Sequence, residues 1–89
     1  MYNLSNLYKI EKFQDGEIIL QHKNTKDIII LNETASYILD LLLKYDIIQA
    51  KEHFISSFSN NNKLNIKSLE EDFNTFVQNY EYHKIIIFR

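Results

Sequence analysis

One stretch of this sequence leaves little freedom in how the chain folds, because a strand pattern runs directly into a helix pattern. Residues Ile28 to Leu31 are four consecutive aliphatics, three of them β-branched, which favours a strand buried on one or both faces. Asn32 follows, and its side-chain oxygen can accept a hydrogen bond from the first free amides of a helix. From Ala35 onward, apolar residues recur at spacings of three and four and so line one helical face. A strand therefore ends and a helix begins with no loop between them, and the helix must fold back over the sheet.

Two further β patterns precede this unit. They are Leu7–Phe13 and Glu17–His22, and they flank Asp15 and Gly16, the only glycine of the chain. Asp-Gly between β-rich runs is a strong hairpin signal, because glycine accepts the positive φ that the turn requires. With Asp27–Leu31 as the third strand, the sequence predicts a three-stranded antiparallel meander.

Three helices are expected after the strands. The first covers Glu33–Tyr45, the second follows Asp46 as its cap, and the third begins near Ser68, which has capping-box spacing to Glu71. A polar loop at residues 59–63 separates the last two. The order of elements predicts an α+β fold: a small winged helix-turn-helix with a three-stranded antiparallel sheet followed by three helices.

The apolar chain end, Tyr82–Phe88, predicts an extra C-terminal strand. Four exposed apolar residues at a chain end would promote aggregation, so another part of the protein should cover them. If this strand paired with the third strand, it would close that edge of the sheet. If it paired with a second copy of the chain, the protein would be a homodimer.

Length and composition limit the classes of protein that fit. The 89 residues predict one domain, residues 1–89, without a second core. The absence of cysteine excludes disulfides and thiolate chemistry and suits a cytoplasmic protein. No apolar run approaches the roughly 20 residues that a membrane span needs, and no signal peptide is visible. A formal charge of −2 argues against a nucleic-acid partner.

Few residues could carry chemistry. A single glycine excludes the glycine-rich phosphate loops of nucleotide-binding proteins. His22, His53 and His83 fall on separate expected elements without a second ligand three or four residues away, so partly exposed histidines are a simpler interpretation than a zinc site. We therefore expect no catalytic residue, no cofactor and no metal, and we do not expect an enzyme.

DNA binding, which a winged helix-turn-helix invites, is opposed by charge. The second helix of such a motif enters the major groove with its N-terminal end forward. Here that end carries Glu70, Glu71 and Asp72 against Lys67 alone, and carboxylates repel phosphates. A winged-helix regulator stays an alternative with the sign of the charge against it. A homo-oligomeric interaction module that uses the C-terminal strand is a second alternative.

Two short motifs, together with the order of the elements, resemble the PqqD-like family. Its members are small peptide chaperones, also called RiPP recognition elements, which serve the synthesis of ribosomally made, post-translationally modified peptides. The first motif is matched at Leu31, Asn32, Glu33, Thr34, Ala35, Ile38 and Leu39. The second is matched in the third helix at Asp72, Phe73, Phe76 and Val77. The resemblance covers nearly the whole chain. The sequence departs from the family at Lys44–Gln49, where many relatives have a glycine, and in its longer apolar end.

The resemblance implies a stand-alone peptide-binding module. It would capture the leader of a precursor peptide as a strand added to the third strand, in the groove beside the third helix, and present it to a separate modifying enzyme. On the strand side the implied peptide-binding residues are Lys26, Asp27, Ile28, Ile29, Ile30 and Leu31. On the helix side they are Leu69, Asp72, Phe73 and Phe76, with Tyr80 at the end of the same face.

Most of these residues also have a plain structural interpretation. Only alternate residues of Ile28–Leu31 can face a peptide, and the others belong to the core. Phe73 and Phe76 have helical spacing and are core residues first. Asp72 can be a first-turn carboxylate that complements the helix dipole and nothing more.

Overall fold

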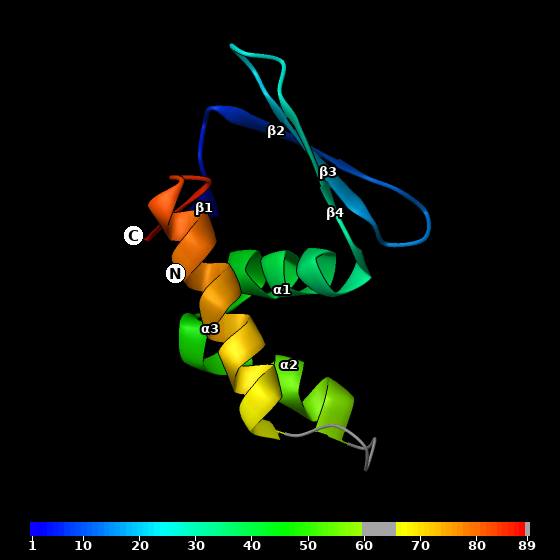
Figure 1. Cartoon of the computed structure of the whole chain (residues 1–89), viewed down its shortest axis with the longest axis vertical. Helices are drawn as coiled ribbons and strands as arrows, with labels where there is room; N and C mark the ends of the chain where they lie inside the picture. The colour runs from blue at the N-terminus through cyan, green and yellow to red at the C-terminus, as the bar shows by residue number, and fades with distance from the viewer. Residues whose placement is uncertain (60–65, 89) are drawn as a thin grey trace.

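The computed structural model describes residues 1–59 and 66–88 and shows an α+β fold (Figure 1). A three-stranded antiparallel sheet is followed by three helices, and a C-terminal strand pairs with an N-terminal one, which confirms the predicted fold class. The elements are β1 (Tyr2–Leu4), β2 (Tyr8–Lys12), β3 (Ile18–His22), β4 (Ile28–Leu31), α1 (Glu33–Lys44), α2 (Ile47–Ser59), α3 (Ile66–Tyr82) and β5 (Ile86–Phe88). The loop expected at 59–63 lies, from residue 60, outside the described residues.

The meander predicted from the sequence is the sheet β2-β3-β4, with β3 in the middle. Its first turn contains Gly16 at φ +91°, and the Gly16 amide donates to the Phe13 carbonyl at 3.0 Å. Antiparallel pairing sets Leu20 opposite Ile29 and Ile19 opposite Ile30. The pleat then directs alternate side chains to opposite faces.

The junction between strand and helix forms as predicted. The Asn32 side chain accepts a hydrogen bond from the Ala35 amide at 2.8 Å, and α1 begins at the next residue, Glu33. The Asp46 carboxylate caps α2 by accepting from the Gln49 amide at 2.9 Å. Each cap supplies an acceptor to a helix amide that has no intrahelical partner.

Helix α3 begins earlier than predicted. It starts at Ile66, so Ser68 lies inside the helix and does not cap it, and the predicted capping box at Ser68 and Glu71 is wrong. The reason is visible in the spacing of Ile66, Leu69 and Phe73, which continues the apolar stripe one turn upstream.

The core lies between the sheet and the helices. α1 packs on β4 at one end and on α2 and α3 at the other, as Figure 1 shows. Phe54 of α2 and Phe73 of α3 are fully buried, with ring centroids 5.8 Å apart. The sheet contributes the inward side chains Ile18, Leu20 and Leu31. Because α1 touches every layer, it fixes where β4 and α3 lie relative to each other.

The C-terminal strand exists, but it is shorter than predicted and its partner is a strand that we did not predict. β5 pairs antiparallel with β1, with Tyr2 opposite Phe88, while Tyr82 belongs to α3. The rings of Tyr2 and Phe88 make a T-shaped contact, with their centroids 5.2 Å apart. Pairing of this strand with β4, considered above, is therefore not what the structure has.

A Schellman turn connects α3 to β5. The Ile85 amide donates to the Tyr80 carbonyl at 2.8 Å, and the Lys84 amide donates to the Glu81 carbonyl at 3.0 Å. Lys84 has φ +58°, the left-handed conformation that glycine usually adopts at this position of the motif. The turn sends the chain back beside β1.

Candidate functional site

The third strand of the sequence prediction is β4, and it forms one edge of the sheet. In an antiparallel ladder, alternate residues direct their N–H and C=O groups toward the neighbouring strand. The His22 amide donates to the Asp27 carbonyl at 2.8 Å, which fixes the phase of this alternation. Leu31 and Ile29 therefore direct their backbone groups toward β3, and Ile28 and Ile30 direct theirs outward. Among the described residues, no other segment pairs with these outward groups.

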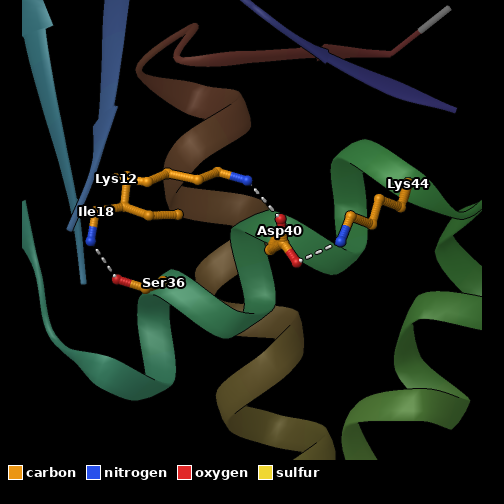
Figure 2. Close-up of polar contacts among 5 residues, drawn as sticks. All are labelled: Lys12, Ile18, Ser36, Asp40 and Lys44. Atoms are coloured by element: carbon orange, nitrogen blue, oxygen red, sulfur yellow. Dashed lines mark hydrogen bonds and ion pairs between the residues drawn. The ribbon is translucent and has the colours of Figure 1, made fainter. Parts of the chain in front are cut away.

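The inner side of β4 is held by a hydroxyl that the sequence analysis did not single out. Ser36 of α1 is buried, and its hydroxyl accepts from the Ile18 amide at 2.9 Å (Figure 2). The same hydroxyl donates to the Leu31 carbonyl at 3.2 Å. The hydroxyl thus stands where a direct bond between the two strands would be. It joins β3, β4 and α1 at the point where the strand becomes a helix. The only feature of the sequence that could have indicated this role is a small hydroxyl residue in the first turns of the helix that follows the strand.

The side chains of β4 divide between two faces. Leu31 is 2% exposed and Ile29 is half-buried, and both pack into the core. Ile28 is 58% exposed and Ile30 is 69% exposed, on the opposite face of the sheet. The same two residues whose backbone groups face outward at the edge therefore also present exposed apolar side chains.

The predicted helix-side residues are mainly core residues in this structure. Leu69, Phe73 and Phe76 are buried, whereas Asp72 is exposed. Tyr80 is half-buried, its ring stacks on Phe76 at 3.9 Å between centroids, and burial raises the pKa of its hydroxyl.

The two halves of the predicted site belong to different packing units. β4 packs on β3 and α1, whereas α3 packs on α1, α2 and β5, so both reach the same helix, α1. Two positions along a helix correspond to a rotation of about 200° around its axis, so Asp72 and Glu70 point to nearly opposite sides of α3. Glu70 lines a hollow against α2, so Asp72 faces away from α2. Lys26 and Asp27 are exposed in the turn before β4.

A separate hollow of about 370 Å³ lies between the β2–β3 turn and α1, and the predicted peptide-binding residues do not line it. Asp40 of α1 accepts from Lys12 at 2.9 Å and from Lys44 at 3.0 Å, as Figure 2 shows. Burial alone would raise the pKa of Asp40, but the hydrogen bonds and charges of the two lysines outweigh it and lower the pKa. The Lys12 pair ties the β2–β3 hairpin to α1, whereas the Lys44 pair lies within α1.

Two other kinds of feature, a metal-ligand cluster and a membrane-spanning helix, are absent from residues 1–59 and 66–88. No three histidine, aspartate or glutamate side chains among them gather as metal ligands would. Within the same residues, no helix is long and apolar enough to cross a membrane.

No known family model matches the sequence, and no curated protein matches it. Two solved structures match the fold. One is TbiB1 in complex with the TbiA(beta) leader peptide, at TM-score 0.71 and 18% identity, covering 94% of this chain and 93% of that one. The other is lasso peptide synthetase B1 complexed with the leader peptide, at TM-score 0.75 and 15% identity, covering 97% and 96%. This chain shares the fold of these two proteins. The resemblance inferred from the two motifs is thus confirmed for the fold, over nearly the whole length of both chains.

Proposed function

We propose that this protein binds the leader segment of a ribosomally made precursor peptide as a strand added to β4, and that it presents the peptide to a separate modifying enzyme. The observation that carries the proposal is the open edge of β4, with outward backbone groups and exposed side chains at Ile28 and Ile30. The shared fold supports it, because both matched proteins were solved with a leader peptide.

Strand addition satisfies the unpaired groups of a sheet edge. Ile28 and Ile30 offer two donors and two acceptors, and each hydrogen bond contributes about 0.5–1.5 kcal/mol, or roughly 2–6 kcal/mol together. Micromolar binding needs about 8 kcal/mol, before the cost of ordering a flexible peptide. Side-chain contacts must therefore add to the backbone bonds.

Two groups of side chains would make such contacts. Ile28 and Ile30 flank the edge on the outer face, and covering an exposed isoleucine contributes about 1–2 kcal/mol. On the inner face, half-buried Ile29 and the half-buried Tyr80 of α3 are the partly open members of the predicted groove. The buried members Leu69, Phe73 and Phe76 would contribute indirectly, by holding α3 against the core.

The chain would supply binding and no bond chemistry of its own, and residues 1–89 would form one peptide-binding domain. The regulator alternative has no observation in its favour, since Glu70, Glu71 and Asp72 are all exposed on the first part of α3. The oligomer alternative loses its main support, an unpaired C-terminal strand, because β5 pairs with β1 of its own chain. A cytoplasmic location stays a prediction from composition.

The sharpest test replaces Ile30 by proline. The Ile30 amide faces outward, so Ile30→Pro removes a donor at the open edge and leaves the bonds between β3 and β4 in place; proline is tolerated at such edge positions. The matched control is Ile30→Ala, which removes the side chain but keeps the amide. Circular dichroism and thermal unfolding confirm that both variants fold.

The ligand to titrate is the N-terminal half of each short peptide encoded beside the gene, measured by calorimetry or fluorescence anisotropy. We expect one such peptide to bind at micromolar affinity, Ile30→Ala to weaken it, and Ile30→Pro to weaken it about tenfold further. Equal affinity of the two variants would refute strand addition at this edge. If no peptide binds to the wild-type protein, the leader-binding proposal itself is refuted.

A further inference from the structure

The edge of β4 has a basic end. A hollow of about 250 Å³ at the turn before the strand is lined by Lys9, Gln21, His22, Lys23 and Lys26. Three of these five residues are lysines, in a chain whose formal net charge is −2. None of the three makes an ion pair within residues 1–59 and 66–88. We call these three lysines the basic end. Their positive charge is not paired with a carboxylate within the described residues.

The basic end is next to the outer face that carries the exposed isoleucines. Gln21 is the cross-strand neighbour of Ile28, and Lys9 is the neighbour of Gln21 on the other side. Lys26 precedes Ile28 by two residues, in the turn that the Lys26 amide closes by donating to the His22 carbonyl at 3.1 Å. Two carboxylates lie nearby, and the three lysines outnumber them. Asp27 accepts from the Thr25 hydroxyl at 3.0 Å, Glu11 lies two residue pairs along β2 from Lys9, and neither forms an ion pair with these lysines.

The other end of β4 has the opposite charge. The strand runs into Asn32, whose side chain is occupied as the cap of α1, and then into exposed Glu33. Along its length, the edge therefore changes from positive at Lys26 through two apolar residues to negative at Glu33. A peptide strand whose charges complement this order would bind the edge in one direction in preference to the other.

We propose that the peptide bound at β4 is antiparallel to it and carries the pattern apolar-x-apolar-x-acidic, read from its N-terminus to its C-terminus. This inference rests on the proposed function and names the kind of leader that the edge selects. Antiparallel pairing continues the ladder of the sheet and is the more stable of the two directions. In that direction, the peptide residues opposite Ile30 and Ile28 place their side chains on the outer face beside them. The residue two positions later lies opposite Lys26, within reach of Lys23.

Three synthetic 14-residue peptides test this. The first has the core Ile-Thr-Ile-Thr-Glu between neutral serine and asparagine flanks. The second has the reversed core, Glu-Thr-Ile-Thr-Ile, and so has the same composition. The third replaces the glutamate of the first by lysine. Each is labelled with fluorescein and titrated with the intact protein, at low salt and at about 0.5 M salt, where charges are screened beyond about 4 Å.

We expect the first peptide to bind about three- to tenfold more tightly than the second, and the third to bind most weakly. The preference should shrink at high salt. Lys26→Glu should reverse the order of the first and third peptides. Lys84→Glu is the matched control, because it reverses a lysine that also has positive φ but lies at the end of α3, and it should leave the order unchanged.

Equal binding of the first two peptides at both salt concentrations would overturn the charge preference, and tighter binding of the reversed core would overturn the antiparallel direction. Absence of binding by all three would overturn the proposed pattern. In each case the proline test at Ile30, made with the neighbouring leader sequences, decides strand addition separately.

Discussion

Removing the Ser36 hydroxyl tests how β4 is held in place. In Ser36→Ala, the Ile18 amide and the Leu31 carbonyl both lose their partner in a buried position. An unsatisfied buried group costs about 1–3 kcal/mol, so two such groups set an upper limit of roughly 6 kcal/mol. The strands can recover part of this by closing until the amide donates directly to the carbonyl. We therefore expect a loss of about 1–3 kcal/mol in the free energy of unfolding.

Urea denaturation followed by circular dichroism measures this loss, and a melting point lower by about 4 °C or more should accompany it. Thr34→Ala is the matched control: it removes an exposed hydroxyl from the same helical turn and should change stability by less than about 0.5 kcal/mol. Hydrogen exchange adds a local readout, because the Ile18 amide should exchange faster in Ser36→Ala than in the control.

A Ser36→Ala protein within about 0.5 kcal/mol of wild type, with unchanged exchange at Ile18, would refute the bridging role. A loss of stability without faster exchange at Ile18 would point to a general packing defect instead. The result also bears on function, since the bridge sets the position of the C-terminal end of β4.

Three further outcomes are expected. Lys84→Gly should raise the free energy of unfolding in urea by about 0.5–1 kcal/mol, since glycine adopts the φ of +58° without strain; no gain would contradict the strain argument. Burial and then the hydrogen bond to Glu81 raise the pKa of Tyr2 to about 12. The contribution of Tyr2 to the free energy of unfolding is therefore complete below pH 10.0 and is lost as the pH rises toward 12. In an absorbance titration, Tyr2→Phe should lack the phenolate transition that the wild-type protein shows at the highest pH. The pKa of Asp40 is lowered despite its burial, because the pairing with Lys12 and a second lysine outweighs desolvation. Asp40→Asn should therefore melt below wild type at neutral pH, and the two should converge as the pH falls below 3.8.

The sequence alone determined those parts of the fold that depend on neighbours in the chain. The run Ile28–Leu31, the cap at Asn32 and the helix after it act within a few residues of each other, and all three form as predicted. The turn at Gly16 follows from one residue's access to positive φ. The first of the two motifs that suggested a recognition element covers the same strand, cap and helix, and the second is a local pattern within α3. Local patterns of this kind explain why the fold could be predicted from the sequence.

Only the tertiary structure decided what depends on distant contacts. β1 has three residues and no pattern of its own, and it exists because β5, from the other end of the chain, pairs with it. That pairing leaves the edge of β4 open, which no local signal could reveal. The phase of the hydrogen-bond ladder selects Ile28 and Ile30, and Ser36 binds the Ile18 amide, 18 residues away in the sequence. The basic end likewise arises only when β2 and the turn after β3 lie side by side. Backbone propensity is local, whereas the pairing of strands and the grouping of charges depend on which distant segments the folded chain brings together.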